Sequence, residues 1–408
     1  MDMQGILSEA SNPESWQRFY EHKLRNRHLN AAEDEALRDF MARKAFLPLC
    51  ALWEQGCFPA TLPAKISINK GGTCKKRIVY SFGGDEGIFL KYIAWQLYRF
   101  DDAFCGNCYA FRRSLGAKDA IARIRRNPHV REQYCLKADI SNYFNSIDVE
   151  KLLEKLAFIS ERDASLYRLF ARILREDRVL ENGQIIRESH GAMAGIPLAP
   201  FFANVYLKDT DRYFLDHGVS YFRYSDDILL FADSPEELAR YQNILYSRLQ
   251  ALGLALNSDK VHISAPGEPW DFLGFCYRNG RFDLSANTLR KTKAKIKRKA
   301  EALRRWQRKK GLAPEKAAIG LIHAMNRKFY GSGRDEDEFT WNRWFFPCLT
   351  VDTGLKELDR YFLEYIRYAA TGRHYKGGYR IRYRTIREWG YRSLVHAYYE
   401  SRRDDSGV

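Results

Sequence analysis

Two stretches of sequence decide the fold: YCLKADISNYFNSID at 134–148 and YFRYSDDILLFA at 221–232. In the first, an apolar run that predicts a β-strand ends at Asp139. In the second, two runs rich in aromatic and aliphatic residues flank Asp226 and Asp227, which predicts a hairpin with two acids at its tip. Taken alone, an Asp that ends a strand is usual as a helix cap, and an Asp in a turn is common. Neighbouring acids repel each other, however, so a strand-end acid that lies beside an acidic hairpin tip indicates a cation site.

The three acids Asp139, Asp226 and Asp227 are therefore candidate catalytic residues and metal ligands. A strand-end acid beside an acidic hairpin is a suitable arrangement for holding two Mg²⁺ ions about 3.5–4 Å apart for phosphoryl transfer. One ion would activate an attacking 3′-hydroxyl, and the other would steady a triphosphate and the leaving pyrophosphate.

The rest of the chain predicts an α+β protein without internal repeats. The expected elements are helices over 1–60, a β-hairpin at 64–82, helices over 86–126, a short hairpin around 182–183, a helix at 235–252, a strand near 261–264, β structure over 272–284, and helices after 286.

The motifs also carry a family resemblance. LKADISNYFNSID, GIPLAPFFANVYL, RYSDDILLFA, LNSDK and FLGF occur in the order of palm motifs A to E of reverse transcriptases, over roughly 65–285. The resemblance implies a right-hand polymerase with an antiparallel-sheet palm and a helical C-terminal thumb. The implied division is an N-terminal helical extension at 1–60, fingers at 61–133, a palm at 134–285 with a fingers insertion at about 150–190, and a helical thumb and C-terminal region at 286–408.

The resemblance assigns roles around the acids. Asp139 and Asp226 match the two metal-binding carboxylates, with Asp227 assisting, and Ile140 would offer a backbone carbonyl to a metal. Phe144 matches the bulky aromatic residue that clashes with a ribose 2′-hydroxyl and so favours deoxynucleotides. Core packing is the alternative role for Phe144.

Several basic residues match positions near the incoming nucleotide. Lys260 stands where a lysine can protonate the leaving pyrophosphate. Arg77 resembles the arginine that grips the triphosphate, because a guanidinium fork suits phosphate oxygens. Lys76 and Lys65 are further candidates, with a solvated position on a strand as the alternative.

Two loops match the template and nucleotide contacts of the family. Arg112, with Phe111 before it, resembles the loop that touches both. Gly195 and Pro197 would let the backbone approach nucleotide and template closely. This segment departs from the family's usual form, because it is shortened and Leu198 stands where glutamine usually follows the proline.

Positive charge is concentrated in one segment. The chain carries a net charge of +16, and residues 290–310 hold 12 basic residues and one acid. Such a block indicates a surface that binds a polyanion. Lys291, Lys295, Arg298 and Arg305 recur on one helical face, as expected of a first thumb helix lying along an RNA–DNA duplex. The segment 372–392 is basic and aromatic, and either RNA binding or core packing explains it.

Other classes of protein are excluded or disfavoured. No apolar run is long enough to span a bilayer and no secretory signal opens the sequence, so we expect no membrane partner and a cytoplasmic location. Eight scattered cysteines indicate reduced thiols, and the single Cys-x-x-Cys at 105–108 is read as structural. The signatures of an HNH endonuclease, RNase H, integrase and retron enzymes are missing.

The C-terminal text FTWNRWFFPCLTVDTGLKELDRYFLEYIRYAATG (339–372) and YRTIREWGYRSLVHAYYE (383–400) resembles class 2 of the bacterial defence-associated reverse transcriptases. That resemblance implies a structured noncoding RNA as template, deoxynucleotides as substrates, an RNA–DNA duplex as product and a role against phage. Two alternatives stay open: a template-independent or protein-primed DNA polymerase, and a catalytically inactive RNA-binding scaffold. The sequence leaves the oligomeric state undetermined.

Overall fold

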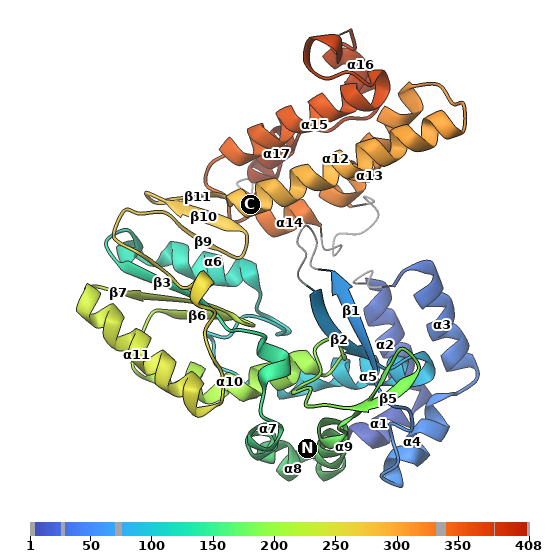
Figure 1. Cartoon of the computed structure of the whole chain (residues 1–408), viewed down its shortest axis with the longest axis vertical. Helices are drawn as coiled ribbons and strands as arrows, with labels where there is room; N and C mark the ends of the chain where they lie inside the picture. The colour runs from blue at the N-terminus through green and yellow to red at the C-terminus, as the bar shows by residue number, and fades with distance from the viewer. Residues whose placement is uncertain (1–4, 26–28, 70–75, 332–339, 379, 406–408) are drawn as a thin grey trace. The chain divides into compact units, whose positions relative to one another are not determined.

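The computed structural model describes residues 5–25, 29–69, 76–331, 340–378 and 380–405 (Figure 1). The chain divides into two compact units. The first comprises residues 1–120 and 133–263, and the second comprises residues 121–132 and 264–408. The expected border between palm and thumb, at 285/286, therefore falls inside the second unit. The helix α6 (Ala117–Arg126) spans the border at 120/121.

Helices open the first unit, as the sequence predicts. They are α1 (Ile6–Ala10), α2 (Pro13–Arg25), α3 (Ala31–Ala42) and α4 (Phe46–Glu54), and they pack with α5 (Gly84–Gln96), which continues into the short 3₁₀ helix η1 (Leu97–Ala103). Trp16 is fully buried at the centre, with its ring 4.1 Å from that of Tyr92 and 5.4 Å from that of Phe46. Aromatic rings packed in this way tie the N-terminal helices to α5.

The central sheet has the strand order β6-β7-β3-β8. Its strands are β3 (Tyr134–Asp139), β6 (Tyr221–Tyr224), β7 (Asp227–Ala232) and β8 (His262–Ser264). The strands β3 and β7 are antiparallel, as are β6 and β7. The helices α10 (Ala199–Asp216) and α11 (Pro235–Ala251) pack against this sheet (Figure 1). The strand at 134–140, the hairpin at 221–232 and the helix at 235–252 are confirmed.

A second sheet has the order β2-β1-β4-β5. The predicted hairpin at 64–82 is present as β1 (Ala64–Asn69) and β2 (Lys76–Ser81), and the hairpin around 182–183 as β4 (Arg178–Glu181) and β5 (Gln184–Arg187). The strands β1 and β4 are parallel. Residues of the expected fingers and of the expected fingers insertion thus share one sheet, and α7 (Val149–Lys155), α8 (Ala157–Arg162) and α9 (Ala164–Arg175) lead into it.

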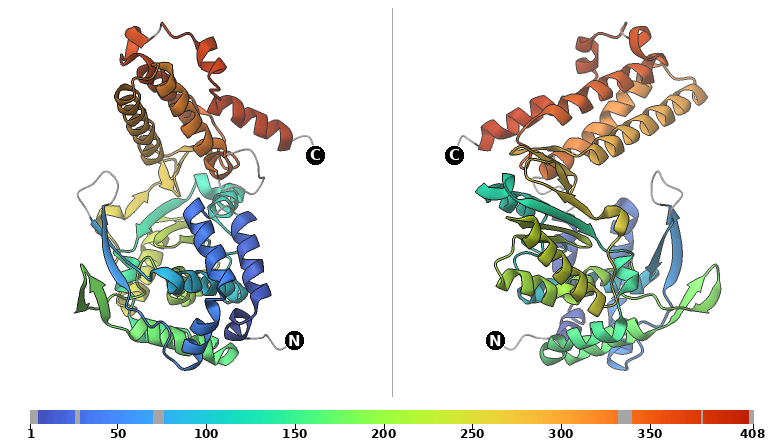
Figure 2. Two further views of the ribbon diagram at one scale, coloured as in Figure 1. Left: turned by 90° about the vertical axis from the view of Figure 1, so that its right-hand side faces the viewer. Right: turned by 60° about the vertical axis from the view of Figure 1, so that its left-hand side comes forward.

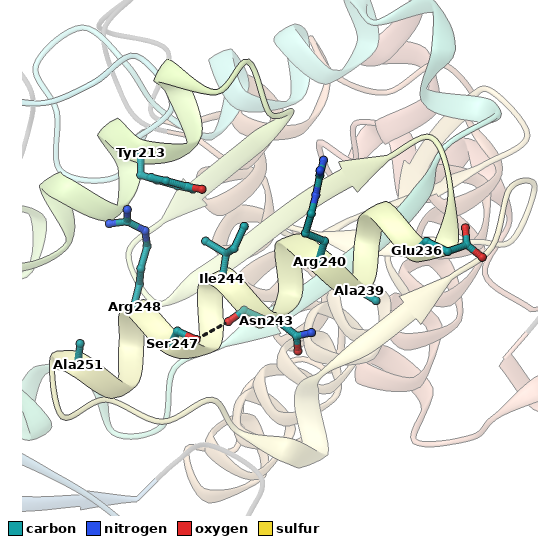
Figure 3. A pocket seen from close by; sticks show the side chains of 9 residues that line it. All are labelled: Tyr213, Glu236, Ala239, Arg240, Asn243, Ile244, Ser247, Arg248 and Ala251. Atoms are coloured by element: carbon teal, nitrogen blue, oxygen red, sulfur yellow. Dashed lines mark hydrogen bonds between the residues drawn. The ribbon is translucent and has the colours of Figure 1, made fainter.

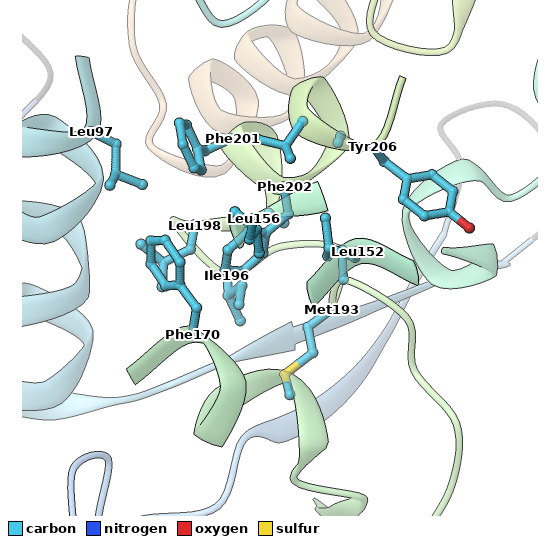
Figure 4. Packing of buried hydrophobic residues seen from close by; sticks show 14 of the residues in the cluster. Leu97, Leu152, Leu156, Phe170, Met193, Ile196, Leu198, Phe201, Phe202 and Tyr206 are labelled. Atoms are coloured by element: carbon cyan, nitrogen blue, oxygen red, sulfur yellow. The ribbon is translucent and has the colours of Figure 1, made fainter. Parts of the chain in front are cut away.

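The core beneath these sheets includes the segment that departs from the family pattern. Ile196, Leu198 and Phe202 are buried and pack near Phe170 and Leu156 (Figure 4). Leu198 is fully buried and is the residue before α10. A glutamine here would bury an amide, which costs free energy unless it finds hydrogen-bond partners. The structure therefore explains Leu198 as a core residue.

The second unit combines a small sheet with a helical bundle. The strands β9 (Trp270–Phe272), β10 (Phe275–Arg278) and β11 (Arg281–Leu284) form a three-stranded sheet. The long helices α12 (Ala286–Lys309), α13 (Glu315–Tyr330) and α15 (Thr353–Thr371) pack side by side (Figure 2). The remaining elements are η2 (Pro128–Arg131), α14 (Trp341–Phe345), η5 (Tyr375–Gly378), α16 (Tyr383–Glu388) and α17 (Leu394–Asp405).

The mixture of helices and largely antiparallel sheets confirms the expected α+β class. Among the described residues, no helix has both the length and the apolar character that crossing a bilayer requires.

Candidate active site

The three predicted aspartates lie at adjacent strand ends. Asp139 is the last residue of β3 and Asp227 the first of β7, and the antiparallel register places them directly opposite each other. Opposite residues of an antiparallel pair have Cα atoms roughly 4.5–5.5 Å apart and side chains on the same face. Asp226 lies in the turn between β6 and β7, and its carbonyl accepts a 3.1 Å hydrogen bond from the N–H of Ile140. The fold thus brings together the three acids and Ile140. Asp226 lies at the tip of the hairpin, as the sequence predicts, whereas Asp227 is already paired with neighbouring strands as the first residue of β7.

Asp139 is buried, and Asp226 and Asp227 beside it are half-buried. Burial raises the pKa of Asp226, and the charge of Asp139 adds to the rise. Burial raises the pKa of Asp227 to about 6, with further contributions from Asp226 and Asp139. Burial and like charge both disfavour the ionised form, and a bound cation would reverse both effects. The site is therefore electrostatically suited to a cation.

Lys260 contacts this site directly. It ends the 3₁₀ turn η4 (Ser258–Lys260), and its Nζ lies 2.7 Å from Oδ2 of Asp139. The N–H of Asn257 donates to the carbonyl of Asp139 at 2.8 Å, which fixes the turn to the end of β3. The Lys260 side chain is about half exposed, so the ammonium group can leave the carboxylate.

The residues present fit a divalent cation by their chemistry. Mg²⁺ prefers carboxylate and carbonyl oxygens, and Asp139, Asp226, Asp227 and the backbone of Ile140 supply them. Within the described part of the chain, no group of three or more His, Cys, Asp or Glu side chains is already arranged around a metal position. The ammonium group of Lys260 occupies Oδ2 of Asp139, so a metal ion that binds this oxygen would displace the lysine.

A buried arginine positions the acidic hairpin, and sequence reasoning missed it. Arg223 is fully buried, and its Nε donates to Oδ1 of buried Asp211 at 2.7 Å. Its Nη1 donates to the carbonyl of Ser225 at 3.2 Å and to Oδ1 of Asn204 at 3.3 Å. Ser225 has φ +61° and directly precedes Asp226. A charged residue in the apolar strand Tyr-Phe-Arg-Tyr was the available signal, because buried charges require partners.

The loop 105–112 packs along the outer edge of β6. Arg223 donates its N–H to the carbonyl of Asn107, and Tyr109 donates to the carbonyl of Arg223, both at 2.9 Å. The buried Arg112 guanidinium pairs with Asp101 at 2.5 Å and donates to the carbonyl of Cys105 at 2.9 Å. These donors are engaged within the protein, so Arg112 shapes this loop, and its contact with template or nucleotide stays a prediction.

The two cysteines of the Cys-x-x-Cys motif are buried free thiols. Burial raises the pKa of Cys108 to about 12, and its sulfur lies 3.1 Å from Nη2 of Arg223. Cys108 therefore belongs to the packing around the hairpin, which agrees with the structural interpretation.

Phe144 lies in the 3₁₀ turn η3 (Tyr143–Ser146), which follows Asp139 and β3 along the chain. It is half-buried, and its ring centroid is 6.4 Å from that of Phe111 in an edge-on arrangement. The Tyr143 hydroxyl donates to the carbonyl of Ala203 at 2.5 Å, which fixes the turn against α10. Phe144 thus has packing contacts, and its exclusion of a ribose stays a prediction.

The basic residues of the β1–β2 hairpin differ in their surroundings. Lys65 lies 2.6 Å from Glu188 and 3.5 Å from Glu181, and Glu188 is the main cause of the raised pKa of Lys65. Lys65 therefore stays protonated, and its positive charge is compensated by these two carboxylates. Lys76 and Arg77 are exposed at the start of β2. Of the three, Lys76 and Arg77 remain accessible to a triphosphate. Residues 70–75, between the two strands, lie outside the described residues.

Gly195 is required by contact with the hairpin. It has φ +110°, and a Cβ atom there would lie 2.8 Å from the carbonyl oxygen of Tyr80. The N–H of Tyr80 donates to the carbonyl of Ala194 at 2.7 Å. The segment before α10 is therefore held against β2. Pro197 is half-buried, and the nucleotide and template contacts of both residues stay predictions.

Three hollows, of about 820, 500 and 450 Å³, are lined by residues other than Asp139, Asp226 and Asp227. One of about 820 Å³ is a shallow depression along α11, where the guanidinium of Arg248 lies 3.7 Å from the ring centroid of Tyr213 (Figure 3). A polymerase site that opens broadly to a duplex would not form an enclosed pocket, so we place the candidate site by its carboxylates.

Comparisons with known proteins agree with this geometry. Residues 85–277 match the family described as reverse transcriptase (RNA-dependent DNA polymerase). The chain is 24% identical over 173 residues to the Retron Ec86 reverse transcriptase of Escherichia coli, covering 41% of this chain and 50% of that protein. It is 26% identical over 148 residues to the Retron Ec83 reverse transcriptase of Escherichia coli, covering 34% of this chain and 45% of that protein. The match thus spans about half the length of these relatives.

Solved structures similar to this chain include the apo telomerase of Candida tropicalis, with a TM-score of 0.47, 12% identity, and coverage of 80% of this chain and 62% of the other. A form truncated from its C-terminal domain gives a TM-score of 0.44 with 14% identity and 55% coverage of each chain. Residues 85–277 are therefore similar to a reverse transcriptase domain, and part of the chain is similar to part of the retron enzymes. The expected right-hand polymerase fold agrees with the mixed architecture of helices and antiparallel sheets.

Proposed function

We propose that this protein is an RNA-directed DNA polymerase that uses two Mg²⁺ ions held by Asp139, Asp226 and Asp227. One observation carries the proposal: the register of β3 and β7 sets Asp139 opposite Asp227, with Asp226 in the adjoining turn, within a domain that matches reverse transcriptases. When bound, the metal ions would activate the primer 3′-hydroxyl and stabilise the charge that develops on the leaving pyrophosphate.

The surrounding residues would bind and orient the nucleotide. Arg77 and Lys76 are exposed and would contact the triphosphate, whereas Arg112 and Lys65 would act through the loop and hairpin that they hold. Phe144 would exclude the ribose 2′-hydroxyl. Lys260, released from Asp139, would donate a proton to the pyrophosphate as the P–O bond breaks.

The helix α12 supports binding of an RNA–DNA duplex. Lys291, Lys295 and Arg298 are exposed on it. Burial, together with the nearby Lys295 and Arg298, lowers the pKa of Lys328 on the neighbouring α13 to about 8. Crowded cations of this kind would be stabilised by phosphate groups. Shape and phosphate contacts, rather than base contacts, are the usual means of binding an A-form duplex.

We further propose that the enzyme acts in bacterial cytoplasm as a class 2 defence-associated reverse transcriptase. Its template would be a structured noncoding RNA, copied from deoxynucleotides into DNA that acts against phage. The C-terminal text at 339–400 and the shortened segment around Leu198 support this assignment. The homology to retron enzymes supports a bacterial reverse transcriptase domain without selecting the class.

The test uses the purified full-length protein with an RNA template, a DNA primer, Mg²⁺ and either deoxy- or ribonucleotides. We expect templated DNA from the wild type and at least a 100-fold lower rate from Asp226→Asn. The matched control is Asp233→Asn, because Asp233 is an exposed acid just beyond the other end of β7. Its rate should equal that of the wild type.

Two results would overturn the proposal in favour of the alternatives. Product made without template, or with a sequence unrelated to it, would indicate a template-independent or protein-primed polymerase. RNA binding with no incorporation by the wild type would indicate an inactive RNA-binding scaffold.

A further inference from the structure

A hollow of about 280 Å³ lies within the first unit, between α2, α5 with η1, and the start of α10. Its walls combine aromatic and basic side chains, and it takes in Phe111 and Pro197. The residues that matter for its chemistry are Lys23, Lys91, Trp95 and Tyr98. Its volume is at the lower end of the range for small-molecule sites.

The hollow adjoins the candidate nucleotide site through one aromatic side chain. Phe111 borders the hollow, and its ring also contacts that of Phe144 at 6.4 Å. Phe144 is five residues beyond Asp139, in the turn that follows β3. A strand that leaves the nucleotide site past Phe111 would therefore enter the hollow that Phe111 borders.

Phe111 is held in a strained and exposed conformation. Its φ is +57°, and 42% of its surface is exposed. On its two sides the backbone is fixed, since Nδ2 of Asn204 donates to the carbonyl of Ala110 at 2.8 Å and Arg112 donates to the carbonyl of Cys105. Strained residues persist where the surroundings over-determine them, and they gather at ligand sites. The ring is therefore a fixed platform.

The side chains of the hollow suit a flat, negatively charged ligand. Trp95 is half-buried and Tyr98 is 37% exposed, so both can present ring surface. Burial lowers the pKa of Lys23 and nearby Lys91 lowers it further, while Glu33, which lies 3.5 Å from Lys91, opposes the shift. An anion beside the two lysines would therefore add to the compensation that Glu33 provides. The acid in the wall, Asp101, is paired with Arg112.

We propose that this hollow receives one unpaired nucleotide of the template strand, next to the templating position. Its base would stack against Trp95 and Tyr98, and its phosphate would face Lys23 and Lys91. A volume of about 280 Å³ is enough for one base. Every base has a stacking face, so the site would act on any template sequence. The inference rests on the proposed function, because it requires an RNA template.

The experiment measures binding of the full-length protein, without divalent metal, to two RNA–DNA duplexes. One carries a three-nucleotide 5′ RNA overhang and the other is blunt-ended. Tyr98→Ala removes a base–aromatic stack, and Lys91→Gln removes a phosphate contact. We expect each variant to weaken binding of the overhang duplex about tenfold and to leave binding of the blunt duplex unchanged. Lys91 is about half exposed, so its variant should fold normally.

Matched controls come from the helix α11, which lies outside the hollow. Tyr246→Ala and Arg240→Gln remove an exposed ring and an exposed charge, and both should bind the two duplexes like the wild type. A 2-aminopurine placed at successive overhang positions should be quenched by the wild type at one position, and Trp95→Leu should restore its fluorescence.

The inference is overturned if Tyr98→Ala and Lys91→Gln bind the overhang duplex as tightly as the wild type does, or if they lose blunt-duplex affinity equally. Primer extension with Mg²⁺ separates this failure from failure of the proposed function. A wild type that extends primers but shows no overhang-specific effect refutes the hollow alone, whereas one that makes no templated product refutes the polymerase assignment.

Discussion

The buried pair of Arg223 and Asp211 should control both the stability of the first unit and the placement of Asp226. The change to test is Arg223→Met, which keeps an apolar side chain of similar length and removes the charge. It would leave the Asp211 carboxylate, 1% exposed, without its guanidinium partner. Breaking a buried ion pair on one side costs about 3–5 kcal/mol. Ser225 and Asn204 would each also lose a hydrogen bond from Nη1.

We therefore expect Arg223→Met to lower the free energy of unfolding by about 4 kcal/mol, a large part of the 5–15 kcal/mol typical of a folded domain. The assay is urea unfolding followed by circular dichroism. Asp211→Asn in the same chain removes the unpaired charge, so the double variant should be about 2 kcal/mol more stable than Arg223→Met alone.

The function should change in parallel, because the Arg223 side chain holds the residue before Asp226. A displacement of about 1 Å at a reacting group can cost about 100-fold in rate. We expect a loss of that order in primer extension by Arg223→Met at a temperature where it is folded. Unfolding within 1 kcal/mol of the wild type, or a double variant no more stable than the single one, would refute the reasoning.

Three further changes have defined outcomes. Gly195→Ala should lower the melting temperature more than the matched Gly183→Ala does, because both glycines have positive φ but only a Cβ at 195 meets backbone, 2.8 Å away. In metal-free protein, the raised pKa of Asp227, about 6, should make the melting temperature rise as pH falls from 7.5 to 5.5, and Asp227→Asn should remove that part of the slope. Lys260→Gln should tighten Mn²⁺ binding, measured by electron paramagnetic resonance, while primer extension slows about 100-fold.

The sign of the pH effect follows from proton binding. The folded state holds a proton on Asp227 at pH values where the unfolded state has released it, so stability decreases as pH rises through this range. Added Mg²⁺ should reverse the trend, because it binds the ionised carboxylates. A melting temperature that rises with pH between 5.5 and 7.5 in wild type but not in Asp227→Asn would contradict the raised pKa. Weaker Mn²⁺ binding by Lys260→Gln would show that this lysine does not compete with the metal.

The sequence by itself determined the elements and the acids at their ends. Short apolar runs rich in aromatic and aliphatic residues predict β3, β6 and β7, and the acids stand where these runs stop or begin. The hairpins at 64–82 and 182–183 follow from Gly and Asn at their turns. The order of the motifs then indicated the similarity to reverse transcriptases, because motif order is a property of the sequence alone.

Tertiary structure decided which side chains were available for chemistry. The sequence predicts Lys65 and Arg112 as nucleotide contacts. The structure pairs Lys65 with Glu188, 123 residues away, and Arg112 with Asp101, 11 residues away, and their contacts with a nucleotide stay predictions. Leu198 read as a lost contact, and its burial makes it a core residue. Charge pairing and burial depend on distances between segments far apart in the sequence, so a local pattern cannot report them. For the same reason, the role of Arg223 and the hollow beside Phe111 emerged only once the chain was folded.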